Sequence, residues 1–228
     1  MRKAGRIPRD WMLQEIPDSN AVDAALDTLI AFRAAHQYAL IKANNGLRSV
    51  VRTSGCPVEV SQRLKRMNTI LDKLIREPTM QLPNMQDIGG CRAVLGSISG
   101  VRKVEQRLKK NRQPVRVYDY ITHPRPSGYR GVHVIVTYED ERRTNRFIEV
   151  QLRTKTMHEW AIAVEQLSGR LGNDLKGSRG PAEVLTFLAA ISRAMAIEEH
   201  GGVVAADLLE EMTKLRVAAL PYMGGPTQ

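Results

Sequence analysis

The sequence has few of the features that mark secreted, metal-stabilised or membrane proteins. It contains only two cysteines in 228 residues, Cys56 and Cys91, and they form no CxxC motif. This argues against a disulfide framework or a zinc site and favours a reducing compartment. No hydrophobic run approaches the length of a transmembrane span, and no apolar segment follows the basic N-terminus as it does in a signal peptide. We therefore expect a cytoplasmic protein without a membrane partner.

The motifs of the most widespread nucleotide-binding and hydrolytic enzymes are also missing. There is no GxxxxGK[ST] loop, no protein-kinase signature, no HExxH and no GxSxG. The five histidines show no spacing typical of metal ligands. A chain that uses ATP without these motifs would bind it in one of the less common nucleotide folds.

The excess of positive charge is the most informative feature of the composition. The chain has 34 Lys and Arg against 24 Asp and Glu, which gives a net charge of +10 and a pI near 9.9. Such a field favours polyanionic partners such as nucleotides or RNA, although a basic protein without such a partner is the alternative. With 43% hydrophobic residues, the chain is expected to form one globular domain with extensions.

The hydrophobic periodicity predicts an α+β fold, with a small mixed or antiparallel sheet of about four to five strands between N- and C-terminal helices. A helix is expected from Ser19 to the Asn44-Asn45-Gly46 cluster, and a second one from about Val58 to Ile75. Strands are expected at 91–97, 116–121, 128–139 and 146–154, and further helices at 100–111, 155–171, 183–201 and 204–216. We divide the chain into a basic extension (1–18), a domain (19–200, with its motifs in 57–170) and a C-terminal helix and tail (201–228).

Polar residues alternate with apolar ones along the last strand. Glu149, Gln151 and Arg153 share one face, because side chains alternate along a strand. Upstream, the segment HPRPSGYRG has two glycines around Tyr129 and Arg130, which suits close approach of a ligand and stacking of a base. Asp87 precedes a predicted strand and suits a magnesium site completed by phosphates. A solvated sheet face and a basic surface turn are the alternative interpretations.

Four segments, in this order, resemble the synthetase domain of the RelA/SpoT family. They are RLKRMNTILDK (63–73), DIGGCR (87–92), DYITHPRPSGYRGVH (119–133) and EVQLRTKTMHEWAIAVE (149–165). The resemblance implies the nucleotidyltransferase-like fold of that domain. It also implies an enzyme that moves the β,γ-pyrophosphate of ATP to a ribose 3′-hydroxyl and releases AMP, with Mg²⁺ as cofactor. The length fits the small, single-domain members of the family.

The resemblance assigns roles by position. It implies catalytic and Mg²⁺-binding roles for Asp87 and Glu149. The implied ATP-binding residues are Arg63 and Arg92 at the adenine and Lys65 and Lys73 near the phosphates. The implied acceptor-binding residues are Tyr129, which would stack on the base, with Arg125, Arg130, His133, Gln151 and Arg153.

The motifs specify the donor more closely than the acceptor, because the departures from the family pattern lie on the acceptor side. Ser127 replaces the usual asparagine and Gly131 the usual serine. We favour a toxin-type enzyme that modifies the 3′-terminal adenosine of tRNA, since basic residues at 2–9, 102–112 and 170–179 could form a track for its backbone. Such a toxin implies an antitoxin partner. The alternatives are an alarmone synthetase acting on GDP, GTP or an adenine nucleotide, and a non-catalytic RNA- or nucleotide-binding module.

Overall fold

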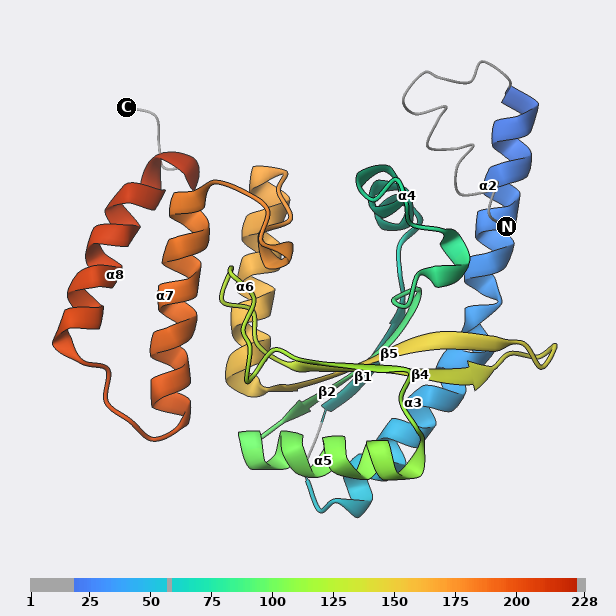
Figure 1. Cartoon of the computed structure of the whole chain (residues 1–228), viewed down its shortest axis with the longest axis horizontal. Helices are drawn as coiled ribbons and strands as arrows, with labels where there is room; N and C mark the ends of the chain where they lie inside the picture. Colours follow the sequence, from blue (N-terminus) through green and yellow to red (C-terminus); the bar gives the residue numbers. More distant parts are fainter. Residues whose placement is uncertain (1–18, 57–58, 225–228) are drawn as a thin grey trace.

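A computed structural model describes residues 19–56 and 59–224, and it contains one five-stranded mixed sheet (Figure 1). The strand order is β1-β2-β5-β4-β3, in which β2 and β5 are parallel and the other neighbours antiparallel. The strands are β1 (Glu59–Leu64), β2 (Gly89–Leu95), β3 (Arg116–Asp119), β4 (Val132–Glu139) and β5 (Asn145–Thr154). The α+β class and the strand number predicted from the sequence are confirmed.

Helices cover the sheet unequally. Below the sheet in Figure 1 lie α3 (His36–Thr53) and α5 (Ile98–Asn111), whereas α4 (Met67–Arg76) and α6 (Lys155–Leu171) rise above it at opposite sides. Next to α6 stand α7 (Ala182–Glu199) and α8 (Ala206–Ala219), and α2 (Ser19–Ala34) extends α3 upward. Short 3₁₀ turns are η1 (Leu82–Asn84), η2 (Leu175–Gly177) and η3 (Leu220–Tyr222). No helix in the described parts of the chain is long and apolar enough to cross a membrane.

The main core lies between the lower face of the sheet and helices α3 and α5. Alternate residues of the two central antiparallel strands are buried in it, as the sequence predicted: Val132, Val134, Val136, Ile148, Val150 and Leu152. Leu47 of α3 and Val104 of α5 pack against them and are completely buried. Because this face is filled, the other residues of the same strands must face the space between α4 and α6.

The hairpin between β4 and β5 also forms where the sequence predicted it. The Oδ1 atom of Asp140 accepts hydrogen bonds from the backbone N–H groups of Arg142 and Thr144, both at 2.9 Å. Such an aspartate turn satisfies backbone donors locally and fixes the register of the two strands.

Two helix predictions were wrong. The segment 58–75 is not one helix, because 59–64 pairs with β2 as an edge strand and only 67–76 is helical. The Asn44-Asn45-Gly46 cluster lies inside α3, and the chain instead breaks at Ala35. Here Asn44 is buried and Gly46 meets Tyr138, since a Cβ on Gly46 would stand 2.9 Å from the tyrosine hydroxyl. Tertiary packing therefore overrides the local preference of this cluster for a turn.

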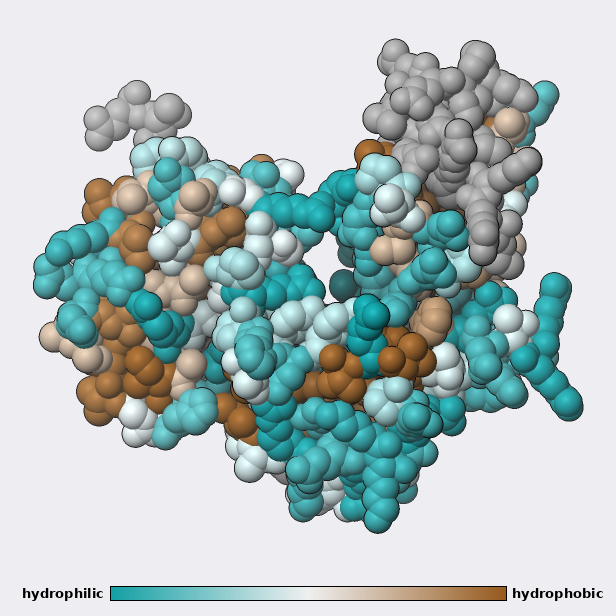
Figure 2. Space-filling view, in the orientation of Figure 1, coloured by the Kyte–Doolittle hydropathy of each residue, from teal (hydrophilic) through white to brown (hydrophobic). Residues whose placement is uncertain are grey.

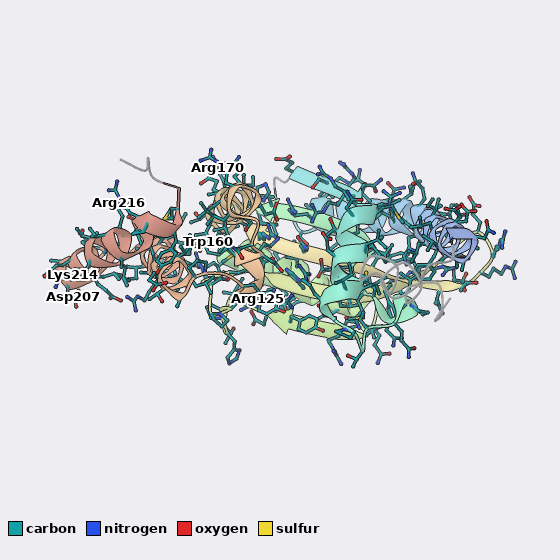
Figure 3. The ribbon with its side chains drawn as sticks, turned by 90° about the horizontal axis from the view of Figure 1, so that it is seen from above. Arg125, Trp160, Arg170, Asp207, Lys214 and Arg216 are labelled. Carbon is teal, nitrogen blue, oxygen red and sulfur yellow. The ribbon has the colours of Figure 1, made fainter. Side chains whose placement is uncertain are left out.

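The C-terminal helices form a second layer around α6. Trp160 of α6 lies between α6 and α7 and donates a hydrogen bond to the carbonyl of Leu188 at 3.3 Å (Figure 3). Ala219 at the end of α8 is buried in the same cluster. The expected boundary at residue 200 falls in the turn between α7 and α8. The basic extension at 1–18 lies outside the described residues.

Candidate active site

The register of the sheet gathers the polar side chains on the upper face into two adjacent rows. Residues paired across neighbouring strands point to the same side of a sheet. One row contains Arg63, Gly90, Glu149, Ile135 and Arg116, and the next contains Ser61, Arg92, Gln151, His133 and Tyr118. The rows lie on the floor of a hollow between α6 and α4, and hydrophilic residues surround this hollow (Figure 2).

Five side chains in these rows and above them form a closed ring of hydrogen bonds. His133 Nδ1 lies 2.9 Å from Glu149 Oε1, and His133 Nε2 lies 2.5 Å from the hydroxyl of Tyr129. That hydroxyl accepts from Arg153 Nε at 3.1 Å, and a terminal nitrogen of Arg153 donates to Gln151 Oε1 at 2.9 Å. Gln151 Nε2 closes the ring by donating to Glu149 Oε2. Each member therefore fixes the orientation of the next.

The electrostatics of the ring keep Glu149 ionised. Burial alone would raise the pKa of this carboxyl, but the hydrogen bonds from the N–H groups of His133 and Gln151 and the charge of Lys176 bring it well below its usual range. Burial lowers the pKa of His133 despite the neighbouring carboxylate. The hydrogen-bond pattern then assigns a neutral imidazole that donates through Nδ1 and accepts through Nε2. The site thus presents a fixed carboxylate on a rigid strand.

A second carboxylate, Asp87, lies just before β2 and is held by lysines from two other segments. Lys65 Nζ is 2.8 Å from Asp87 Oδ2, and Lys73 Nζ of α4 is 3.1 Å from Asp87 Oδ1. Burial opposes ionisation, yet the two ammonium groups lower the pKa of Asp87. A buried cluster between α2 and α4 sets the position of α4, and it includes Leu29, Ile70 and Leu74.

The predicted adenine-binding arginines lie on neighbouring strands of the same face. Arg63 on β1 is exposed, and Arg92 on β2 is partly buried and donates from Nε to Gln151 Oε1 at 3.4 Å. Burial is the main reason why the pKa of Arg92 is lowered, and the charge of Arg63 lowers it further, so the two guanidinium groups interact. The structure therefore brings Arg63, Lys65, Lys73 and Arg92 together on the side of the hollow formed by β1, β2 and α4.

Asp87 and Glu149 have the chemistry of a magnesium site that a nucleotide would complete. The charge of Glu149 partly offsets the lowering of the pKa of Asp87 by the two lysines. No group of three or more His, Cys, Asp or Glu residues in the described ranges is placed to hold a metal. Two carboxylates fit Mg²⁺ better than most other metals, because Mg²⁺ is often held by one or two carboxylates plus substrate phosphates.

The predicted acceptor residues do not all face the hollow. Arg130 is 6% exposed, and its Nη1 atom lies 2.8 Å from Glu199 Oε2 at the end of α7. The structure thus gives Arg130 a partner on α7 and not on the ring. Arg125 covers Tyr120, with its guanidinium carbon 4.6 Å from the ring centroid and a 3.0 Å hydrogen bond to the hydroxyl. Arg125 remains near Tyr129, at 5.6 Å from its ring centroid.

Tyr129 itself is completely buried. Besides its two hydrogen bonds, its ring contacts Tyr120 and His133 edge-on and is tilted against Trp160. Three cations surround the ring: Arg153 at 5.1 Å, Lys176 at 5.2 Å and Arg125 at 5.6 Å from the centroid. A base could stack on Tyr129 only after at least one of these groups had moved.

The loop that carries Tyr129 requires a glycine at position 128. Gly128 has a φ of +87°, and a Cβ on it would lie 2.8 Å from Ala189 Cα and 2.8 Å from Ser192 Cβ. Its carbonyl accepts a 2.6 Å hydrogen bond from the Ser192 hydroxyl. The loop is therefore pressed onto α7, which explains why the Gly-Tyr pair is found here.

Two groups of site residues were missed by the sequence reasoning. Lys176 of η2 was counted only as part of the general basic charge, but it is partly buried and pairs with Glu165 of α6 at 2.8 Å. Tyr118 and Tyr120 at the edge strand stack in parallel, with centroids 5.9 Å apart. The alternation Arg-Val-Tyr-Asp-Tyr in the sequence could have revealed the tyrosines. No local pattern indicates that Lys176 reaches Tyr129.

The basic residues of α5 lie on the opposite side of the sheet from the hollow, as Figure 1 shows for the whole helix. Several also have local partners. Arg102 pairs with Glu105 and Asp119, both at 2.9 Å, and Lys109 pairs with Glu105. Arg107 donates to a backbone carbonyl, as does Arg112, which also covers the ring of Tyr138. The helix thus does not extend the positive charge of the site. The basic residues at 2–9 lie outside the described part of the chain.

Comparisons with known proteins identify the family of the chain. The family model for the region found in RelA/SpoT proteins matches residues 62–167. The chain is 30% identical over 181 residues to the GTP pyrophosphokinase YwaC of Bacillus subtilis, which covers 74% of this chain and 80% of YwaC. It is 28% identical over 198 residues to the GTP pyrophosphokinase YjbM of the same organism, covering 82% and 86% of the two chains.

Solved structures show the same fold. The crystal structure of small alarmone synthetase 2 from Bacillus subtilis has a TM-score of 0.61 and 26% identity, covering 74% of this chain and 95% of that one. Small alarmone synthetase 1 from Bacillus subtilis, bound to its product pppGpp, has a TM-score of 0.67 at 24% identity, covering 84% and 97%. The chain belongs to the RelA/SpoT family and is a pyrophosphokinase.

Proposed function

We propose that this enzyme transfers the β,γ-pyrophosphate of ATP to the 3′-hydroxyl of GDP or GTP and so makes an alarmone nucleotide. The observation that carries the proposal is the meeting of two sets of polar groups at Glu149. Lysines and arginines from β1, β2 and α4 lie on one side of it, and the His133–Tyr129–Arg153 part of the ring lies on the other. The matched relatives YwaC and YjbM, named as GTP pyrophosphokinases, support a guanosine acceptor.

On the donor side, each group has a task that its chemistry suits. Arg63 and Arg92 have planar guanidinium groups that can stack on adenine. Lys65 and Lys73 are both paired with the carboxylate of Asp87. If that carboxylate bound Mg²⁺, the two ammonium groups could bind phosphate oxygens of ATP instead. Bound there by Asp87 and Glu149, Mg²⁺ would neutralise charge on the phosphates.

On the acceptor side, Glu149 orients the attacking hydroxyl. The 3′-oxygen forms a bond to the β-phosphorus of ATP, the bond from that phosphorus to the α,β-bridging oxygen breaks, and AMP leaves. The pKa of Glu149 lies well below its usual range, so this carboxylate stays ionised, is free to accept a hydrogen bond and is a weak base. We therefore assign it to holding the hydroxyl in line, with the proton passing to it only as the oxygen–phosphorus bond forms.

The net charge of +10 favours a second acceptor, the 3′-terminal adenosine of tRNA. The position of α5 weakens that reading, because its basic residues lie behind the sheet and several of them are paired. A non-catalytic module is the least favoured candidate, since it has no need for two carboxylates, Asp87 and Glu149, held by basic side chains on one face of the sheet.

The decisive experiment incubates the purified chain with γ-³²P-ATP and, separately, with GDP, GTP or deacylated tRNA. We expect label in a guanosine tetra- or pentaphosphate, and none in tRNA. Label in tRNA alone would overturn the guanosine proposal in favour of the toxin-type reading. Label in neither acceptor, from a protein with a cooperative thermal transition, would support the binding module. Asp87→Asn serves as the inactive control.

A further inference from the structure

We propose that Lys176 is an acceptor-binding residue, whose ammonium leaves the ring of Tyr129 and binds a phosphate of the acceptor nucleotide. This inference rests on the proposed function and deepens it, because it names a phosphate-binding group of the acceptor site. Neither the sequence motifs nor the polar rows of the sheet include this lysine.

Lys176 lies beside the ring of Tyr129 and is mostly shielded from solvent. Its Nζ atom lies 5.2 Å from the centroid of the Tyr129 ring, and its side chain is only 18% exposed. The other cations near this ring are fixed more firmly. Arg153 is completely buried and hydrogen-bonded to two side chains, and Arg125 is bonded to the hydroxyl of Tyr120. Lys176 is therefore the group beside Tyr129 that can move at the lowest cost.

The ion pair with Glu165 does not by itself fix the ammonium. Glu165, which lies 2.8 Å from Lys176, is 42% exposed, so water can take the place of the lysine at this carboxylate. A lysine stem has four rotatable bonds, so the ammonium can swing while the backbone stays where it is. The backbone itself is anchored, because its carbonyl accepts from the Ser127 hydroxyl at 3.3 Å, and the Ser178 hydroxyl accepts from the Ser127 N–H at 3.1 Å.

The surrounding charge identifies the ligand as an anion. The charged and titratable groups around Lys176 are Arg92 of β2, His133 of β4, Glu149 and Arg153 of β5, Glu165 of α6, and Arg125 and Tyr129 of the loop. With Lys176, four cations thus share this space with two carboxylates. Burial and the charge of Arg153 lower the pKa of Lys176 to about 8, which means that Glu165 compensates its charged form only in part. A phosphate would supply that compensation.

The location also favours the acceptor over ATP. Lys176 lies above Tyr129 and is hydrogen-bonded through its backbone to the acceptor loop, whereas Lys65 and Lys73 approach from the other side of the hollow. A movement that uncovers Tyr129 and places a cation on the acceptor phosphates would couple base stacking to phosphate binding. The two events would then occur together.

Steady-state kinetics on the full chain test this assignment. We expect Lys176→Met to raise the KM for GDP or GTP about tenfold or more and to leave the KM for ATP within about twofold, with Lys176→Arg recovering most of the loss. Lys214→Met is the matched control, because Lys214 on α8 also pairs with a glutamate, at 2.7 Å, and lies at the end of the molecule far from the sheet (Figure 3). Equal effects of Lys176→Met on both KM values, or no effect on either, would overturn the inference.

A second measurement is independent of catalysis. Titration calorimetry with GDP at pH 8, in buffers of different ionisation enthalpy, counts the protons taken up on binding. A lysine of pKa about 8 that gains a phosphate partner takes up about half a proton, and this uptake should disappear in Lys176→Arg. Equal uptake in both proteins would refute the assignment even if the variant binds well. If the proposed function itself is wrong, the wild-type protein will label no guanosine nucleotide, and this result separates that failure from a failure of the Lys176 assignment.

Discussion

Replacing Arg130 by methionine tests whether this arginine holds the fold or binds the acceptor. Its ion pair with Glu199 is deeply buried, with side-chain exposures of 6% and 7%. Methionine keeps much of the length of the side chain but leaves the carboxylate of Glu199 uncompensated. The second oxygen of that carboxylate, Oε1, already has no hydrogen-bond partner in the described structure, and the carboxylate lies at the negative end of the α7 dipole.

The magnitude follows from the burial. Removing one partner of a buried pair costs about 3–5 kcal/mol, and for a chain of this size each kcal/mol corresponds to about 2–4 °C. We therefore expect Arg130→Met to lower the melting temperature by about 6–20 °C. Arg193→Met removes an exposed pair with Glu211, whose side chains are 55% and 47% exposed, and should cost less than about 1 kcal/mol.

The double variant separates the two roles. Arg130→Met with Glu199→Met removes both charges, so its stability should return to within about 1 kcal/mol of wild type or exceed it. Thermal or urea unfolding measures the stability, and the KM for GTP measures the acceptor site. A stable double variant with an unchanged KM shows that Arg130 acts through the fold. A KM raised about tenfold in the stable double variant would refute our reasoning and support the role expected from the sequence.

Three further substitutions test the site. Asp87→Asn should lower kcat by about 100-fold or more with little loss of fold, measured as product formed per enzyme; activity near wild type would exclude Asp87 from catalysis. Gly128→Ala should destabilise the chain by about 2 kcal/mol or more in urea unfolding, because of its positive φ and its contact with α7; unchanged stability would show that the loop yields. Tyr129→Phe removes the hydroxyl between His133 and Arg153. It should lower the stability by about 1–3 kcal/mol and should also lower kcat; a stable variant with full activity would show that the closed ring of hydrogen bonds is dispensable.

The sequence predicted the parts of the site that depend on the two-residue alternation of side chains along a strand. On β5 the two-residue alternation separates Glu149, Gln151 and Arg153 from the core residues between them, and the structure has the same division. The edge strand β1 was missed, because its short segment EVSQRL runs into an amphipathic helix and its pairing with β2 is not local. Long-range pairing of this kind leaves little trace in a single sequence.

The individual contacts of the acceptor side could not be predicted from the sequence for a different reason. Arg130 and Arg125 look equivalent in the sequence, yet Arg130 contacts Glu199, 69 residues later on a helix, and Arg125 contacts Tyr120, which directly follows β3. Lys176 reaches Tyr129 because η2 folds back onto the loop. Which basic residue faces a ligand is decided by such tertiary contacts, and charge patterning along the chain does not encode them.

The closed ring of side chains has a consequence for how each substrate affects the binding of the other. Gln151 Oε1 accepts from Arg92 on the donor side and from Arg153 on the acceptor side. If Arg92 stacked on adenine, its hydrogen bond to Gln151 would break, and Gln151 Oε1 would accept from Arg153 alone, the residue that also orients Tyr129. ATP would then prepare the acceptor site, and linkage requires that the acceptor raise the affinity for ATP by the same factor. The ring would thus make the two substrates bind with positive cooperativity within one small domain, without any movement of the sheet.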